Sequence, residues 1–166
     1  THNKKKMTCY TINFPHFSEV KSLSVGIENG YSLQKGKQYI NPLPVVFYGS
    51  SITHGGCASR PGMTYPNIIS RHLDTDIINL GFSGNAKGEE VIAKYISDLD
   101  MSVFVLDYDH NAPDFKYLEN THERMFKIIR EKNPTLPIII MTRSSILHPE
   151  TRKRRIEVIR RTYENA

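Results

Sequence analysis

A serine follows the first buried apolar run of the sequence, in the loop Gly49-Ser50-Ser51-Ile52-Thr53-His54-Gly55-Gly56. A serine at a tight strand-to-helix turn is exposed, and the backbone N–H groups of such a turn can stabilise developing negative charge. The loop differs from the nucleophile elbow of α/β-hydrolases, because Thr53 stands where that motif has its second glycine. Taken alone, it is explained better by the turn preferences of glycine and serine than by chemistry.

Two further polar clusters follow apolar runs, at Phe82-Ser83-Gly84-Asn85 and at Asp109-His110-Asn111. Gly84 could offer an unobstructed backbone N–H to an oxyanion, or it could simply cap a turn. The side-chain amide of Asn111 could donate to the same oxyanion, although a polar cluster after a strand also suits a helix start. Together, Ser51, Gly84 and Asn111 follow three successive predicted strands, which is a far more specific pattern than any one of them.

Four apolar runs alternate with four stretches of helical periodicity between residue 45 and the C-terminus. We predict strands at Val45–Gly49, Ile77–Leu80, Val103–Asp107 and Pro137–Met141, and helices around Tyr65–Leu73, Val91–Leu99, Phe115–Ile129 and Ile156–Tyr163. Repeated strand–helix units imply a parallel sheet with helices on both faces, which is a three-layer α/β/α, flavodoxin-like fold. In such folds ligands bind beyond the carboxyl ends of the strands, where the three polar clusters are expected.

The chain divides at Asn41-Pro42-Leu43-Pro44, where two prolines punctuate the sequence. We predict a β-rich N-terminal segment over residues 1–41 and an α/β domain over residues 42–166. Met7–Phe14 and Val20–Ile27 are partly alternating and β-rich, so we expect short strands there. These strands are too few to close a sandwich, which favours the tail of another β domain or an extension that packs on the α/β domain.

The composition is that of a globular protein, with 39% hydrophobic and 23% charged residues among 166. No apolar stretch has the length of a membrane span, so we expect no membrane insertion. The net charge of +5 includes basic runs at Lys4–Lys6 and Arg152–Arg155. The second run alternates with Ile156, Ile159 and Tyr163 at helical spacing, so its charges are predicted to form the solvated face of a helix. Because no aromatic residues are interleaved, we expect no nucleic-acid partner.

No spacing of cysteine and histidine resembles a zinc site, and we expect no metal and no cofactor. A flavodoxin-like nucleotide or flavin binder would share the architecture, but the loop Ser51–Gly56 is neither a P-loop nor a G-x-G-x-x-G motif. For Cys9 and Cys57 we expect two free thiols, one buried and one in a loop, with a single disulfide as the alternative.

The three polar clusters resemble the conserved blocks of the SGNH (GDSL-like) hydrolases, in the family's order. Phe47-Tyr48-Gly49-Ser50-Ser51-Ile52-Thr53 looks like block I, with Ser50 replacing the usual aspartate. Phe82-Ser83-Gly84-Asn85 resembles block II, and Asp109-His110-Asn111 resembles block III. The resemblance covers residues 44–166 and implies the SGNH hydrolase fold.

The resemblance also implies a serine esterase that cleaves acyl esters through an acyl-enzyme on Ser51. The backbone N–H groups of Ser51 and Gly84 and the side chain of Asn111 would form the oxyanion hole. The stretch Gly55–Met63 is similar to a bacterial esterase subgroup with an N-terminal β domain. That similarity suggests a small-molecule or O-acylated carbohydrate ester as substrate, and a secreted or periplasmic location.

The family's fourth block, an Asp-x-x-His after the last strand, has no counterpart in this sequence. The one literal match, Asp107 to His110, overlaps block III, and we interpret it as coincidence. Ser50, His54 and His110 are candidates to line the pocket, but neither histidine has a predicted orienting carboxylate. We therefore expect a truncated chain that lacks its general base and is nearly inactive.

A missing last strand would leave an exposed sheet edge, so we expect self-association through that edge. The alternative function is a non-catalytic module with the same fold that binds a sugar or a partner and does not turn it over.

Overall fold

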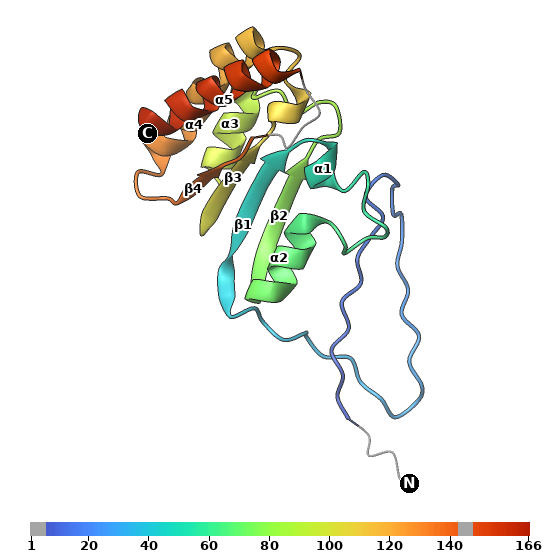
Figure 1. The fold of residues 1–166 in the computed structure, drawn as a ribbon. Helices are drawn as coiled ribbons and strands as arrows, with labels where there is room; N and C mark the ends of the chain where they lie inside the picture. Colours follow the sequence, from blue (N-terminus) through green and yellow to red (C-terminus); the bar gives the residue numbers. More distant parts are fainter. Residues whose placement is uncertain (1–5, 143–147) are drawn as a thin grey trace.

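The computed structural model describes residues 6–142 and 148–166 of the chain (Figure 1). Its centre is a four-stranded sheet in the order β2-β1-β3-β4, in which every paired strand is parallel. The strands are β1 (Asn41–Gly49), β2 (Thr75–Gly81), β3 (Val103–Asp107) and β4 (Ile138–Ile140). The predicted parallel sheet is therefore confirmed, and β3 has the predicted bounds.

Helices cover both faces of this sheet, which confirms the predicted α/β/α layers (Figure 1). Three of them, α3, α4 and α5, lie on one face, and α2 lies on the other. The short α1 stands at the carboxyl end of β1, where the sequence predicts a strand-to-helix turn. The helices are α1 (Ser51–His54), α2 (Tyr65–Leu73), α3 (Glu90–Ser97), the 3-10 turn η1 (Asp109–Asn111), α4 (Phe115–Lys132) and α5 (Pro149–Glu164).

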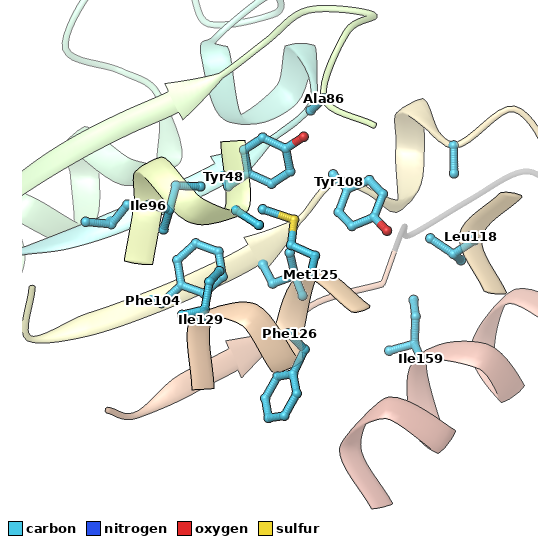
Figure 2. Close-up of a cluster of buried hydrophobic side chains, with 14 of the residues drawn as sticks. Tyr48, Ala86, Ile96, Phe104, Tyr108, Leu118, Met125, Phe126, Ile129 and Ile159 are labelled. Atoms are coloured by element: carbon cyan, nitrogen blue, oxygen red, sulfur yellow. The ribbon is translucent and has the colours of Figure 1, made fainter. Parts of the chain in front are cut away.

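Alternate residues of the central strand face opposite layers, because side chains of a strand point alternately to its two faces. Val46 and Tyr48 belong to the larger cluster with the helices α3, α4 and α5, part of which Figure 2 shows. Val45 and Phe47 pack with the smaller cluster toward α2. Strands covered on both faces read as continuous apolar runs, which is why they are visible in the sequence.

The two strands expected in the N-terminal segment, at Met7–Phe14 and Val20–Ile27, do not form, and that prediction was wrong. Residues 6–40 contain no strand, and most of their large apolar side chains are exposed. An isolated pair of strands is only marginally stable without a partner surface, and no sheet face covers this segment within the described residues. The prolines of the predicted boundary lie inside β1, at its irregular beginning, where the pairing with β2 changes register.

The inward face of α5 also differs from the prediction. Its buried residues are Arg155, Val158, Ile159 and Thr162, whereas Tyr163 is 72% exposed. Arg155 was expected on the solvated face with the rest of its basic run, but it is buried in an ion pair with Asp109. A charge that is paired and hydrogen-bonded can occupy an inward position that an apolar pattern would assign to its neighbour.

Strand β4 forms an edge of the sheet, because it pairs with β3 and with no other strand in the described ranges. A groove of about 500 Å³ lies between β4 and α5, and its lining includes Ile139, Ile156 and Tyr163. The expected self-association through this edge stays a prediction. Of the helices in the described part of the chain, none has the length and apolar character that crossing a bilayer requires.

Candidate active site

The carboxyl ends of β1, β2 and β3 lie in one row of the sheet. Gly49, the last residue of β1, pairs with Gly81 of β2 on one side and with Asp107 of β3 on the other. The N–H of Phe82 then donates to the Gly49 carbonyl at 2.9 Å. In the strand order β2-β1-β3-β4 the winding reverses between β1 and β3, and ligands bind at such switch points. The three polar loops therefore start from neighbouring points on the binding edge.

Ser51 is the first residue of α1, directly after the N-cap residue Ser50. The Ser50 hydroxyl oxygen accepts a hydrogen bond from the N–H of Ile52 at 3.2 Å. Ser50 is completely buried, so it caps the helix from inside rather than facing the solvent. Ser51 is half-buried, and within residues 6–142 and 148–166 its hydroxyl has no hydrogen-bond partner. That hydroxyl is open to an outside ligand.

The cap predicts the effect of replacing Ser50 by alanine. The substitution leaves the Ile52 N–H without its acceptor, so we expect the free energy of unfolding to fall by about 1 kcal/mol. Urea unfolding at neutral pH measures this change. Ser59→Ala is the matched control, because Ser59 is an exposed serine nine positions further along. Equal stability of the Ser50→Ala variant and the parent chain would contradict the capping role.

Two glycines allow α1 to pack directly on the strand ends. A Cβ atom at Gly49 would lie 2.0 Å from the hydroxyl oxygen of Thr53 and 2.9 Å from the carbonyl oxygen of Asp107. A Cβ atom at Gly81 would lie 2.2 Å from the backbone nitrogen of His54. Neither contact was predicted from the sequence, although the first two predicted strands each end on or next to a glycine.

Gly84 occupies a tight turn in the loop after β2. The N–H of Asn85 donates to the carbonyl of Phe82 at 2.9 Å, and Gly84 has a φ of +73°. A positive φ at this position of a turn favours glycine strongly. Gly84 is exposed, and its own N–H makes no hydrogen bond within the described part of the chain. This N–H is therefore accessible, as an oxyanion donor must be.

Tyr48 of β1 fixes the far end of the same loop. Its hydroxyl accepts from the N–H of Gly88 at 2.9 Å and donates to the carboxylate of Glu89 at 3.0 Å. Burial raises the pKa of Tyr48 above its ordinary value, which keeps the hydroxyl protonated and able to donate. The loop that carries Gly84 is thus tied to the central strand at both of its ends.

Asn111 reaches across from η1 to the loop of Gly84. Its side-chain N–H₂ group donates to the carbonyl oxygen of Phe82 at 2.9 Å. The same carbonyl closes the turn at Gly84, so one oxygen joins the two loops. One hydrogen of the amide is used in this bond, and the other has no partner among the described residues. The structure therefore brings Asn111 to the Gly84 loop and leaves one N–H of its amide available to a ligand.

Asp107, at the end of β3, joins the nucleophile helix to the rest of the domain. Its carboxylate accepts from the hydroxyl of Thr53 at 2.9 Å and from that of Tyr65 at 2.8 Å. Burial raises the pKa of Asp107, although both hydrogen bonds oppose this rise. This role of Asp107 was not predicted from the sequence, because the two hydroxyls come from α1 and α2, which are distant in sequence. The carboxylate thus holds α1 and α2 together.

The imidazole of His54 faces the N-terminal segment. Its Nε2 lies 2.7 Å from the carbonyl oxygen of His16, and the ring of Phe17 stands 4.1 Å from the His54 ring. Because the carbonyl is an acceptor, the Nε2–H group of His54 donates to it. Nδ1 is buried and without a partner among the described residues. Within those residues, no hydrogen bond therefore joins His54 to the Ser51 hydroxyl.

His110 lies half-buried in η1, between Asp109 and Asn111. The carboxylate of Asp107 accepts hydrogen bonds from Thr53 and Tyr65, and the nearby His110 acts to lower the pKa of this carboxyl group. The interpretation of the Asp-x-x-His match as coincidence stays a prediction.

The two cysteines, Cys9 and Cys57, are unpaired and exposed. The expectation that one of them is buried was wrong, because Cys9 lies in the N-terminal segment, which adds no strand to a core. In the parts of the chain that the structure describes, no three His, Cys, Asp or Glu side chains come together as a possible metal site.

A family model matches most of the chain. The model of the GDSL-like lipase/acylhydrolase family matches residues 43–165. A comparison with curated protein sequences gave no match.

Solved structures share the fold. A GDSL-like lipase from Bacteroides ovatus is 34% identical with a TM-score of 0.80, over 92% of this chain and 47% of its own. The salicylyl-acyltransferase SsfX3 of a tetracycline biosynthetic pathway is 23% identical with a TM-score of 0.68, over 84% of this chain and 42% of its own. A family two carbohydrate esterase from Clostridium thermocellum, solved with cellohexaose, is 15% identical with a TM-score of 0.58, over 81% of this chain and 53% of its own. The chain spans less than half the length of the first two structures.

Proposed function

The chain belongs to the GDSL-like lipase/acylhydrolase family, and we propose that its site cleaves acyl esters by nucleophilic attack of Ser51. One observation carries the proposal. The residues Gly49, Gly81 and Asp107 lie in one row, so that Ser51, Gly84 and Asn111 follow from the same edge of the sheet. Open donors and an open hydroxyl at a switch point are what an acyl-transfer site requires.

The chemistry has two halves. The Ser51 oxygen attacks the ester carbonyl, and the resulting oxyanion accepts hydrogen bonds from the N–H groups of Ser51 and Gly84 and from the amide of Asn111. Collapse of the tetrahedral intermediate breaks the bond to the alcohol oxygen, which leaves as the alcohol after protonation, and an acyl-Ser51 ester remains. Water then attacks this ester, releases the carboxylic acid and restores the Ser51 hydroxyl.

The serine proton needs an acceptor, and the described residues place no imidazole at Ser51. His54 is engaged with the carbonyl of His16, and the Ser51 hydroxyl has no hydrogen-bond partner. We therefore expect this chain to react slowly with an ester and to hydrolyse the acyl-Ser51 slowly too. A site without its base retains only part of its catalysis, from oxyanion stabilisation and binding.

For the substrate we propose an O-acylated carbohydrate or a related small acyl ester. Family two carbohydrate esterases share this fold, which supports the class but does not fix the substrate. The lack of an imidazole at Ser51 among the described residues favours a second candidate, a module that binds its ligand without turnover. The two functions differ in one observable, the covalent adduct on Ser51.

The test is acylation of Ser51 by an activated acetate ester such as 4-nitrophenyl acetate. Peptide mass spectrometry should show an acetyl group on Ser51 that accumulates with time and is absent in Ser51→Ala. Ser59 serves as an internal control, because it is an exposed serine of the same loop region without the oxyanion donors. We expect Ser51 to react at least 100-fold faster than Ser59, since residual oxyanion catalysis is on the order of 10³-fold.

Two outcomes would contradict the proposal in different ways. Acetylation of Ser51 at the rate of Ser59 would remove the catalytic function and leave the binding module. Rapid Ser51-dependent turnover would keep the esterase and show that a base exists within this chain, contrary to our expectation of slow hydrolysis.

A further inference from the structure

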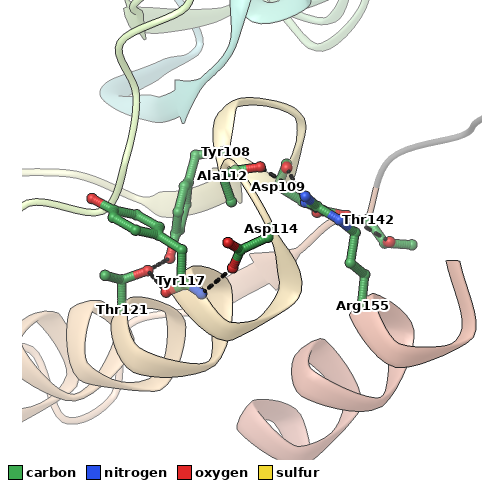
Figure 3. A network of polar contacts seen from close by, with 8 residues as sticks. All are labelled: Tyr108, Asp109, Ala112, Asp114, Tyr117, Thr121, Thr142 and Arg155. Carbon is green, nitrogen blue, oxygen red and sulfur yellow. Dashed lines mark hydrogen bonds and ion pairs between the residues drawn. The ribbon is translucent and has the colours of Figure 1, made fainter. Parts of the chain in front are cut away.

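A buried arginine holds the turn that carries Asn111 (Figure 3). Arg155 projects from α5 with a side chain that is 4% exposed, and the Asp109 side chain that it meets is 0% exposed. Its Nη1 donates to the carboxylate of Asp109 at 2.6 Å and to the Asp109 carbonyl at 2.8 Å. Its Nη2 donates to the carbonyl of Ala112 at 2.7 Å. One guanidinium therefore forms hydrogen bonds to the residues on both sides of His110 and Asn111.

The other oxygen of Asp109 is also held. Thr142, just after β4, donates its hydroxyl to this oxygen at 3.1 Å (Figure 3). The Asp109 carboxylate is thereby fixed between α5 and the end of β4. A guanidinium is suited to this task, because its planar donors are rigidly spaced and stay charged when buried.

Backbone hydrogen bonds within the turn fix Asn111 relative to Asp109. The N–H of Asn111 donates to the Tyr108 carbonyl at 2.9 Å, and the N–H of Ala112 donates to the Asp109 carbonyl, the same oxygen that Arg155 contacts. The Asn111 amide then reaches Phe82 on the opposite side. The position of the Asn111 amide is thus fixed by α5 through Arg155 and by the Gly84 loop through Phe82.

Stability alone does not explain such an arrangement. Removing two charges from water offsets most of the attraction between them, so a buried ion pair is weak evidence for a stabilising role. With Thr142, the pair joins α5, η1 and the end of β4, and its contacts meet at the turn beside the binding edge. A fixed position for an oxyanion donor is worth more to an ester hydrolase, since a displacement of about 1 Å can cost on the order of 100-fold in rate.

We infer that Arg155 is a positioning residue for the oxyanion donor Asn111, acting through Asp109 and the carbonyl of Ala112. The inference rests on the proposed function for its catalytic consequence, whereas the positioning itself is a property of the fold. The competing explanation is that Arg155 merely fastens α5 to the domain.

The first measurement reads the position of Asn111 directly. In an isotope-labelled chain, the side-chain amide of Asn111 should show a shifted NMR signal and slowed hydrogen exchange, because it donates to Phe82. Arg155→Lys keeps the charge but loses the fork of donors, and Arg155→Met loses both. We expect the shift and the protection to disappear in Arg155→Met and to be partly retained in Arg155→Lys.

Arg161→Met is the matched control. Arg161 also ties α5 to α4, through an exposed ion pair with Glu119 at 3.0 Å, but it does not contact η1. If Arg155 only fastened α5, both methionine variants would leave the Asn111 signal unchanged in folded protein, and that result would overturn the inference. Should Arg155→Met fail to fold by circular dichroism, Arg155→Lys and Thr142→Val, which removes the second contact to Asp109, take its place.

The second measurement is a double-mutant cycle on the acylation of Ser51 by 4-nitrophenyl acetate. Asn111→Ala should slow acylation on the order of 100-fold, and Arg155→Met should slow it comparably. The double variant should be no slower than Asn111→Ala, because both substitutions remove the same donor. Effects that multiply would show that Arg155 acts independently of Asn111 and would overturn the inference.

The two measurements separate this inference from the proposed function. A lost Asn111 signal in Arg155→Met, with no Ser51 acylation in the parent chain, would leave the positioning role intact and remove the esterase. An unchanged signal in a parent chain that acylates normally would leave the esterase and remove the positioning role.

Discussion

Replacing Gly81 by alanine should lower the free energy of unfolding by more than about 3 kcal/mol and the melting temperature by on the order of 10 °C. The new Cβ atom would lie 2.2 Å from the backbone nitrogen of His54 and 2.4 Å from its Cα atom. Because both are backbone atoms, no side-chain rotation relieves the clash, and either α1 or the end of β2 must move. Urea and thermal unfolding at neutral pH measure the loss.

Alanine substitutions at two other glycines serve as controls for this loss of stability. Gly26 has open space around it and an ordinary φ, so Gly26→Ala should change stability by no more than about 0.5 kcal/mol. Gly84 also has open space but a φ of +73°, so Gly84→Ala should cost only the strain of that conformation, about 1 kcal/mol. If Gly81→Ala were as stable as Gly26→Ala, α1 would not pack on the strand end as the structure has it.

The sheet and the order of its loops could be predicted from the sequence because they depend on local patterns. Strands buried on both faces read as apolar runs, and Val103–Asp107 agrees with the structure residue for residue. Once the sheet is parallel, all loops that follow the strands must emerge at the same edge. The convergence of Ser51, Gly84 and Asn111 needed no more than this.

The contacts that fix those loops could not be predicted, because each joins elements that are distant in sequence. Asp107 is separated from its partners Thr53 and Tyr65 by 54 and 42 positions, and Arg155 from Asp109 by 46. A charged residue at an inward helical position is indistinguishable by pattern from one on a solvated face. The hydrophobic pattern therefore assigned Arg155 to the wrong side of α5.

These buried polar residues share a location. Ser50, Thr53, Asp107, Asp109 and Arg155 are all buried, and all contact the loops at the carboxyl edge of the sheet. The large apolar cluster instead fills the space between the sheet and α3, α4 and α5 (Figure 2). Buried polar groups are costly unless they are hydrogen-bonded, and here their hydrogen bonds fix the loops that carry the candidate site.

The N-terminal segment shows the limit of propensity as a guide. Its β-branched and aromatic residues favour strands, yet residues 6–40 contain none. The segment instead contacts the site through His16 and Phe17, which pack on His54. A strand needs a partner strand and a face to cover, and neither is encoded in the local sequence.

Acid should weaken the packing of α5 through His122. This histidine of α4 is 1% exposed, and its Nδ1 lies 2.8 Å from the hydroxyl oxygen of Thr162 in α5. Burial lowers the pKa of His122 to about 4, although the negative charges of Asp109 and Glu123 oppose this shift. The unfolded chain, with an ordinary histidine pKa of about 6.5, binds the proton more readily. The stabilisation is therefore complete above pH 6.5 and is lost as the pH falls toward 4.

For a single histidine with these two pKa values, the free energy of unfolding should fall by about 2 kcal/mol between pH 7.5 and pH 5. Urea unfolding of the parent chain and of His122→Gln at both pH values isolates this contribution, since carboxylates titrate alike in the two proteins. The difference between the two pH values should shrink by about that amount in His122→Gln and stay unchanged in His72→Gln, an exposed histidine of α2. Equal pH dependence in the parent and His122→Gln would mean that His122 accepts a proton within the folded chain, and that the α4–α5 contact is open to water.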